Sequence, residues 1–195
     1  YINDDALCEA DPLIKMALIH HRFESIHPFY DGNGRTGRII NLLYLVAKGL
    51  LDLPVLYLSR YIIRNKGDYY RELQQARVTG QWEPWLLYML KGVSETARHT
   101  IALIHQIKEL MTNQQERMRT ALPKIYRKEL LENLFKHPYT KIEFVMDDLD
   151  VTRLTATKYL DLLTEHNFLH KAKIGRSNFY INHPLFDLFT NGSGA

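Results

Sequence analysis

The sequence has little of what marks secreted, membrane-spanning or low-complexity proteins. It holds one cysteine, Cys8, which excludes an internal disulfide framework and suits a reducing compartment, so we expect the cytoplasm. Its longest apolar stretch, LLYLVAKGLLDLPVLYL, is interrupted by Lys48, Asp52 and Pro54, which predicts a buried helix and a turn rather than a membrane span. The 10 glycines and 7 prolines among 195 residues are too few for a low-complexity chain.

The sequence also lacks a strong excess of charge of one sign, because its 25 Lys and Arg residues nearly balance its 22 Asp and Glu residues and the net charge is +3. This mild excess suits a phosphate ligand but does not demand nucleic acid. The opening residues, YINDDALCEAD, are polar and acidic, unlike a secretory signal. The first residue is Tyr rather than Met, so we interpret the chain as part of a longer protein. The hydrophobic content of 46% is enough for one sizeable core, or for a medium and a small domain.

The first half of the chain has the apolar periodicity of helices. Residues 12–23 are expected to form a helix with Asp11 as N-cap, which His27-Pro28 should end. A tight loop at 31–34 should lead into a second helix at about 35–47. The middle of this second helix is apolar nearly all round, so we expect it to be the most buried helix of a bundle.

The later helices and a hairpin suggest a second domain that begins near residues 118–123. Three short amphipathic helices precede two strands around a Gly-Arg-Ser turn, which is the order of a winged helix-turn-helix. The expected segments are helices at 59–77 with Ser59 as a cap, at 82–120 as one helix or two, and at 123–138, 144–150 and 153–168 with Thr152 as the last N-cap, then strands within 168–181.

Between the first two helices lies HPFYDGNGRTGR, residues 27–38, which is dense in polar residues and glycine. Gly32 and Gly34 permit positive φ and leave backbone N–H groups uncovered before a helix, a pattern typical of a phosphate-binding nest. Arg35 and Arg38 would oppose the dipole at that helix N-terminus, which indicates that a ligand supplies negative charge there.

Two further side chains of this segment could complete a transfer site. Asp31 is a lone carboxylate beside the nest, and one carboxylate plus phosphate oxygens commonly hold Mg²⁺. His27 could take a proton from an incoming hydroxyl near neutral pH. The residues therefore predict phosphoryl or nucleotidyl transfer. The plainer readings are that His27 caps a helix, Asp31 forms an Asx-turn and the arginines are solvated.

The segment resembles the signature of the Fic family, His-Pro-Phe-x-(Asp/Glu)-Gly-Asn-Gly-Arg-x-x-Arg, and matches it at every defined position. The flanking stretches DPLIKMALIHHRFESI, LDLPVLYLSRYIIRNKGDYY and WEPWLLYML are similar to bacterial members that carry a C-terminal winged helix. The resemblance implies an all-α Fic-type helical bundle at residues 1–118 and a winged helix-turn-helix domain at residues 119–195. The docking flap and inhibitory helix that precede the motif in relatives are not evident in residues 1–26.

Such proteins transfer AMP from ATP to a Ser, Thr or Tyr hydroxyl of a protein, and the resemblance implies this activity here. Self-modification is expected too, because a tethered hydroxyl has a high effective concentration. It implies that His27 is the general base, that Asp31 binds Mg²⁺ and that Arg38 is catalytic and orients the phosphates. Phe29 would be a core anchor. The implied nucleotide-binding residues are Gly32, Asn33, Gly34, Arg35, Thr36, Gly37, Arg38, Tyr69 and Tyr70. In relatives a pair of tyrosines at the position of Tyr69 and Tyr70 lies against the adenine base. The alternative for these two rings is that they pack in the core.

Other functions stay open at this stage. The same residues could remove AMP from a target or transfer another phosphate-containing group. The chain could instead be a nucleotide-sensing transcriptional regulator that binds DNA through its winged helix, although Asp161 and Glu165 dilute the positive face. The resemblance makes a homodimer a mild favourite, because many relatives dimerise, and no membrane partner is expected. The candidate phosphate contacts of the winged helix are Arg153, Thr155, Thr157, Lys158, Lys171, Lys173 and Arg176.

Overall fold

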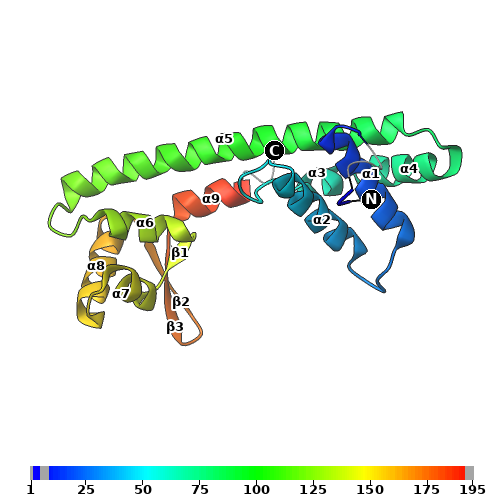
Figure 1. Cartoon of the computed structure of the whole chain (residues 1–195). Coiled ribbons are helices and arrows are strands. Elements are labelled where there is room, and N and C mark those ends of the chain that lie inside the picture. Colours follow the sequence, from blue (N-terminus) through cyan, green and yellow to red (C-terminus); the bar gives the residue numbers. More distant parts are fainter. Residues whose placement is uncertain (1, 5–8, 192–195) are drawn as a thin grey trace. The chain divides into compact units, whose positions relative to one another are not determined.

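The computed structural model describes residues 2–4 and 9–191, so Cys8 and the end of the NGSGA tail lie outside the described residues. The chain is mostly helical with one small three-stranded sheet (Figure 1). It divides into two compact units, residues 1–101 and 102–195, and the division falls within the long helix α5 (Glu83–Ala121). Within the described ranges, no helix combines the length and hydropathy that crossing a bilayer needs.

Helix α1 (Pro12–Ile26) begins where the sequence predicted. Asp11 is the N-cap, and its side chain accepts a hydrogen bond from the Leu13 N–H at 2.8 Å. The helix runs three residues beyond Phe23 and ends at His27, whose φ of 50° is left-handed. The expected break before Pro28 is therefore confirmed.

Helix α2 (Asn33–Ala47) packs beside α1 and starts two residues earlier than expected (Figure 1). Gly32 is its N-cap, so the loop after His27 is only five residues long and Asn33 and Gly34 belong to the first turn. The expectation that α2 is the most buried helix is wrong. Ile39 and Leu43 are 56% and 58% exposed, because only the side of α2 that carries Gly37, Asn41, Tyr44 and Leu45 is buried.

The remaining helices of the first unit are α3 (Ser59–Arg64), α4 (Lys66–Thr79) and the start of α5. One continuous helix was expected over 59–77, but it breaks at Asn65, whose side chain donates to the Tyr61 carbonyl at 2.9 Å. Ser59 is the first helical residue and Leu58 is the N-cap, so the predicted Ser59 cap is wrong. Trp85 of α5 is fully buried and its Nε1 donates to the Ala17 carbonyl at 3.0 Å, which ties α5 to α1.

The second unit contains the end of α5, four short helices and the sheet. The sheet has the order β1-β3-β2 with antiparallel pairs, and Tyr180 of β3 lies opposite both Thr140 and Lys171. Thr152 caps α8 as predicted, by accepting from the Thr155 N–H at 3.3 Å. The elements are α6 (Lys128–Lys136), β1 (Tyr139–Thr140), α7 (Ile142–Leu149), α8 (Arg153–Glu165), β2 (His170–Ile174), β3 (Ser177–Ile181) and α9 (His183–Asn191). Neither β1 nor α9 was expected.

Candidate functional site at the start of helix α2

The mouth of α2 presents backbone N–H groups without partners. Gly32 adopts φ 86° and offers no side-chain cap. Asn33, Gly34 and Arg35 occupy the first three helical positions, where no intrahelical acceptor exists, and no other acceptor contacts their N–H groups within the described residues. The helix dipole lies behind these three N–H groups, which together have the chemistry of an anion-binding nest, and the binding of a phosphate there stays a prediction.

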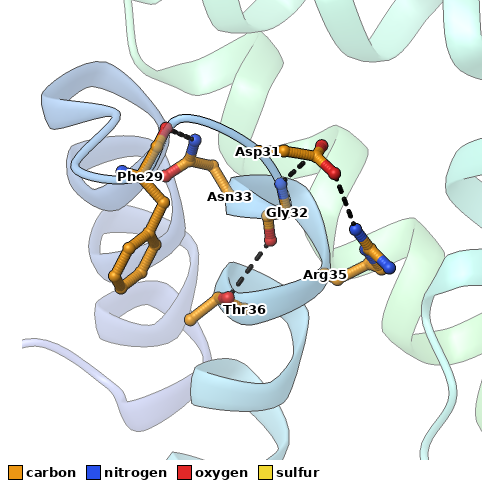
Figure 2. Close-up of polar contacts among 6 residues, drawn as sticks. All are labelled: Phe29, Asp31, Gly32, Asn33, Arg35 and Thr36. Atoms are coloured by element: carbon orange, nitrogen blue, oxygen red, sulfur yellow. Dashed lines mark hydrogen bonds and ion pairs between the residues drawn. The ribbon is translucent and has the colours of Figure 1, made fainter.

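The Asn33 side chain is used inside the loop rather than toward a ligand. Its Nδ2 donates to the Phe29 carbonyl at 2.6 Å, and its Oδ1 accepts from the Phe29 N–H at 2.9 Å (Figure 2). Asn33 is 3% exposed, so water does not compete for these bonds. The backbone of Asn33, not its amide, is therefore the part available to a phosphate.

The Phe29 ring lies near Phe23, with centroids 6.2 Å apart. It is half-exposed rather than buried, so the expectation that Phe29 is a core anchor is not met. Its backbone has the ordering role instead, because both of its polar groups are bound by Asn33.

Asp31 and Arg35 lie on the opposite side of the loop and form an ion pair at 3.1 Å (Figure 2). The other carboxylate oxygen of Asp31 accepts from the Gly32 N–H at 2.7 Å. The Asp31 side chain is 86% exposed, so it keeps lone pairs for a cation. No group of three or more His, Cys, Asp or Glu side chains that could hold a metal ion occurs in the described ranges. The donor set fits Mg²⁺ held by one carboxylate together with phosphate oxygens and water.

The inner face of α2 is closely packed. Thr36 binds the Gly32 carbonyl through its hydroxyl at 3.1 Å, and Gly37 is buried against α1. A Cβ added at Gly37 would lie 3.0 Å from Glu24 Oε1 and 3.1 Å from the His20 ring, so only glycine fits without displacement. Thr36 and Gly37 thus shape the helix start, whereas a direct nucleotide contact for either remains a prediction.

Arg38 is half-buried on this inner side, one turn along from the nest. Its Nε is buried and has no hydrogen-bond partner within the described part of the chain. A side chain that sequence reasoning missed, Glu24 of α1, faces the same region. Burial raises the pKa of the Glu24 carboxyl above its usual range, against the opposing effects of His27 and Arg38.

His27 forms the C-cap of α1, and its N–H donates to the Phe23 carbonyl at 3.0 Å. Its left-handed backbone turns the chain sharply into the loop, and histidine is among the residues that tolerate this conformation. The side chain is exposed, so it is accessible to an incoming hydroxyl. Its role as general base stays a prediction.

The two tyrosines that were expected near adenine have different surroundings. Tyr69 is 4% exposed, and its hydroxyl lies 2.9 Å from Nε2 of His20 in the core. Burial raises the pKa of the Tyr69 hydroxyl far above its usual value and lowers the pKa of His20 to about 4. Tyr70 is exposed, with its ring edge-on to Tyr69 at 5.3 Å. Of the two rings, that of Tyr70 is the exposed one, and the ammonium of Lys66 lies over it at 5.8 Å from the ring centroid.

Two family comparisons match this chain. Residues 1–45 match the Fic/DOC family, and this range contains α1, the loop and the nest. Residues 110–185 match the C-terminal domain of the family described as protein adenylyltransferase SoFic-like. The second range holds α6, α7, α8 and the sheet of the second unit, and it ends within α9.

Curated relatives are each similar to less than half of the chain. Protein adenylyltransferase fic-1 of Caenorhabditis briggsae is 31% identical over 93 residues, 47% of this chain and 17% of the relative. A probable protein adenylyltransferase of Aquifex aeolicus is 46% identical over 66 residues, 34% of this chain and 18% of the relative. Protein adenylyltransferase Fic of Nematostella vectensis is 32% identical over 85 residues, 44% of this chain.

The chain therefore spans less than a fifth of the length of these three relatives. Both parts of the sequence nonetheless agree with the resemblance read from the motif, since the N-terminal match covers the whole of HPFYDGNGRTGR and the C-terminal match is to a domain of adenylyltransferases. The first part of the chain, residues 1–45, is therefore similar to the Fic/DOC family, and the later part, residues 110–185, is similar to a C-terminal domain of the SoFic-like type.

Proposed function

We propose that this protein is an adenylyltransferase that transfers AMP from ATP to a Ser, Thr or Tyr hydroxyl of a protein, including its own. The observation that carries the proposal is the nest of three N–H groups at the mouth of α2, flanked by Arg35 and Arg38. Partial positive charge on the amides and full charge on the guanidiniums suit a polyphosphate. The names of the relatives support the same activity.

In this proposal, His27 accepts the proton of the acceptor hydroxyl. The oxygen then forms a bond to the α-phosphorus of ATP, and the bond from that phosphorus to the bridging oxygen of the β-phosphate breaks. Pyrophosphate leaves with the electron pair of the broken bond. The nest and Arg38 stabilise negative charge on the phosphates, and the exposed His27 afterwards returns its proton to solvent.

Asp31 is the residue that would hold Mg²⁺. The ion supplies charge neutralisation on the phosphates when it is bound. Binding would require Asp31 to exchange its ion pair with Arg35 for the cation. Arg35, which is 72% exposed, would then be free to reach phosphate oxygens. We also propose that the exposed Tyr70 stacks on the adenine base and that Tyr69 supports it from the core.

For the C-terminal part, from about residue 119, we propose a winged helix-turn-helix in which α8 is the second helix and β2–β3 the wing. Support comes from the order of α6, α7, α8 and the hairpin. Two of its cations are already paired, Arg153 with Glu143 at 3.1 Å and Lys171 with Asp161 at 3.0 Å. This pairing favours a protein-docking role over DNA recognition, because fewer charges remain for phosphate contacts. A cytoplasmic setting and a homodimer remain predictions from the sequence.

The test is to incubate the chain with Mg²⁺ and ATP that is labelled at either the α- or the γ-phosphate. Adenylylation transfers the α-label to protein and releases pyrophosphate, and mass spectrometry finds AMP on a hydroxyl residue. Transfer of the γ-label alone would mean that phosphate is moved instead and would refute the proposal. A parallel sample with His27→Ala controls for non-enzymatic labelling.

A further inference from the structure

The carboxylate of Glu24 lies near the C-terminal end of α1, a position that is unfavourable for negative charge. Glu24 is in the last turn of α1, three residues before His27, and negative charge near a helix C-terminus opposes the dipole. Its side chain is half-buried, and Oε1 is buried with no hydrogen-bond partner within the described residues. Buried carboxylate oxygens without partners are rare because they lose their hydration, so this one invites a functional explanation.

Glu24 and Arg38 approach the same backbone from α1 and α2. A Cβ added at Gly34 would lie 3.1 Å from the Arg38 NH1 nitrogen and 3.7 Å from Glu24 Oε1. A carboxylate oxygen and a guanidinium nitrogen thus both lie within 3.7 Å of one point. They form no ion pair in the described part of the chain, and Arg38 Nε is itself buried without an acceptor. Two half-buried side chains of opposite charge are therefore near one another, and each has one buried atom, Glu24 Oε1 and Arg38 Nε, without a partner among the described residues.

We infer that Glu24 is a positioning residue for Arg38: in the nucleotide-bound protein, its carboxylate accepts a hydrogen bond from the inner edge of the guanidinium and directs the outer edge toward the phosphates. This inference rests on the proposed function of the site. It adds a residue outside the HPFYDGNGRTGR segment to the machinery that holds ATP.

The geometry of arginine explains why such a partner matters. The guanidinium has five donors in a fixed plane, so a bond to the inner edge sets the direction of the outer edge. Pairing would also satisfy two buried atoms, Glu24 Oε1 and Arg38 Nε, that otherwise lack the hydrogen bonds they make in water. Burial raises the pKa of the Glu24 carboxyl, and the positive charges of His27 and Arg38 oppose that rise only in part.

His20 is another polar side chain near Glu24, and it is a poorer partner for the carboxylate than Arg38. Its Nδ1 and Glu24 Oε1 both lie within 3.1 Å of the position that a Cβ at Gly37 would take. Burial lowers the pKa of His20 to about 4, so its ring is neutral at physiological pH. Nε2 of His20 is engaged by Tyr69, which fixes the ring in the core. Arg38 is thus the permanent cation that Glu24 faces.

The experiment compares Glu24→Gln with Glu95→Gln in the full chain. Glu24→Gln preserves shape and removes the charge. Glu95 is an exposed residue of α5 paired with Lys91, so Glu95→Gln makes the same chemical change away from the motif. We expect Glu24→Gln to slow AMP transfer at saturating ATP by roughly 10- to 100-fold, with ATP affinity unchanged or tighter because a negative charge near the phosphates is gone. A merely structural role would instead weaken ATP binding and lower the melting temperature together.

A double-mutant cycle tests the partnership without relying on transfer. ATP affinity is measured by calorimetry for wild type, Arg38→Ala, Glu24→Ala and the double variant. If Glu24 positions Arg38, Arg38→Ala lowers affinity at least about threefold more in the wild-type background than in the Glu24→Ala background. Equal losses in the two backgrounds, or unchanged transfer by Glu24→Gln, would overturn the inference.

The two proposals fail in different ways. Coupling between Glu24 and Arg38 in ATP binding without any transfer of the α-label would keep the positioning role and refute the adenylyltransferase. Transfer of the α-label with additive affinities would keep the enzyme and refute the positioning role. Absence of ATP binding by the wild-type chain would refute both.

Discussion

The side chain of Asn33 binds both backbone polar groups of Phe29, one as donor and one as acceptor, across the loop that joins α1 to α2. This pairing sets the path of the chain from Pro28 to Gly32. It also leaves the Asn33 N–H free at the mouth of the helix. The loop is thus ordered from within, and its outer amides remain open to a ligand.

Asn33→Asp should disrupt this arrangement, because a carboxylate cannot donate to the Phe29 carbonyl and would repel it. We expect the free energy of unfolding to fall by about 1–3 kcal/mol, measured by urea denaturation, and ATP affinity to fall with it. Asn178→Asp, at an exposed position of β3, is the matched control and should change stability by less than about 0.5 kcal/mol. Equal stability of the two variants would show that the Phe29 bonds contribute nothing.

Replacement of His27 should separate catalysis from binding. His27→Ala is expected to lower AMP transfer by at least about 100-fold while ATP binding by calorimetry stays within about twofold, because the base acts only on the acceptor hydroxyl. Since His27 has a left-handed backbone, His27→Asn serves as a second variant that tolerates this conformation better than alanine. Loss of ATP binding in the Asn variant would contradict the assigned role.

The two arginines should differ in their effects. Arg38→Ala is expected to weaken ATP binding and to slow transfer, since the half-buried guanidinium faces the nest region and has a donor to spare. Arg35→Ala should have the smaller effect on the rate, because Arg35 is exposed and paired with Asp31. Arg98→Ala, exposed on α5, is the control for loss of charge. Transfer by Arg38→Ala at the Arg98→Ala rate would remove Arg38 from the site.

A glycine of α5 should be indispensable to packing in the first unit. A Cβ at Gly92 would lie 2.6 Å from Cδ1 of Tyr61, a ring that is 8% exposed. Gly92→Ala should therefore lower the free energy of unfolding by about 1–3 kcal/mol despite better helix propensity. Gly67→Ala in α4 meets no heavy atom within 4 Å and should be neutral or stabilising. The prediction fails if the two variants unfold at the same urea concentration.

Stability should depend on pH through His20. Its pKa is 6.5 unfolded and about 4 folded, so between these values the unfolded state binds a proton that the folded state does not. The free energy of unfolding should fall as pH falls through this window, by up to roughly 3 kcal/mol. The raised pKa of Glu24 has the opposite effect on stability as pH falls. The contribution of His20 must therefore be obtained by comparing the wild type with a variant that lacks His20.

The measurement is urea denaturation of wild type and His20→Gln at about pH 7 and about pH 4.5. The variant lacks the titrating group, so its loss of stability between the two pH values should be smaller than that of the wild type. Parallel losses would mean that His20 does not titrate differently on folding.

Local signals in the sequence predicted several helix ends correctly. Asp11, the His27-Pro28 break and Thr152 are caps or breakers whose chemistry acts within a few residues, and each is confirmed. The start of α2 was placed too late, because a glycine N-cap has no side chain to mark it. The break at Asn65 rests on one side-chain bond to Tyr61, which sequence periodicity does not register.

The sequence did not predict properties that depend on tertiary contacts. Ile39 and Leu43 are as apolar as the buried residues of α2, and only the position of α1 decides that they are exposed. Strand β1 has two residues and exists because β3 lies beside it. Glu24 belongs to the site region only because Gly37 and Gly34 let α1 and α2 approach closely.

Because Gly32 provides no side-chain cap, the stability of the fold should report whether an anion is bound at the N-terminus of α2. An anion that binds at the N-terminus of α2 in the folded state alone adds RT ln(1 + [L]/Kd) to the free energy of unfolding, where [L] is its free concentration and Kd its dissociation constant. Thermal scans against a panel of nucleoside polyphosphates would consequently rank them by affinity, with no assay of turnover and no knowledge of the acceptor.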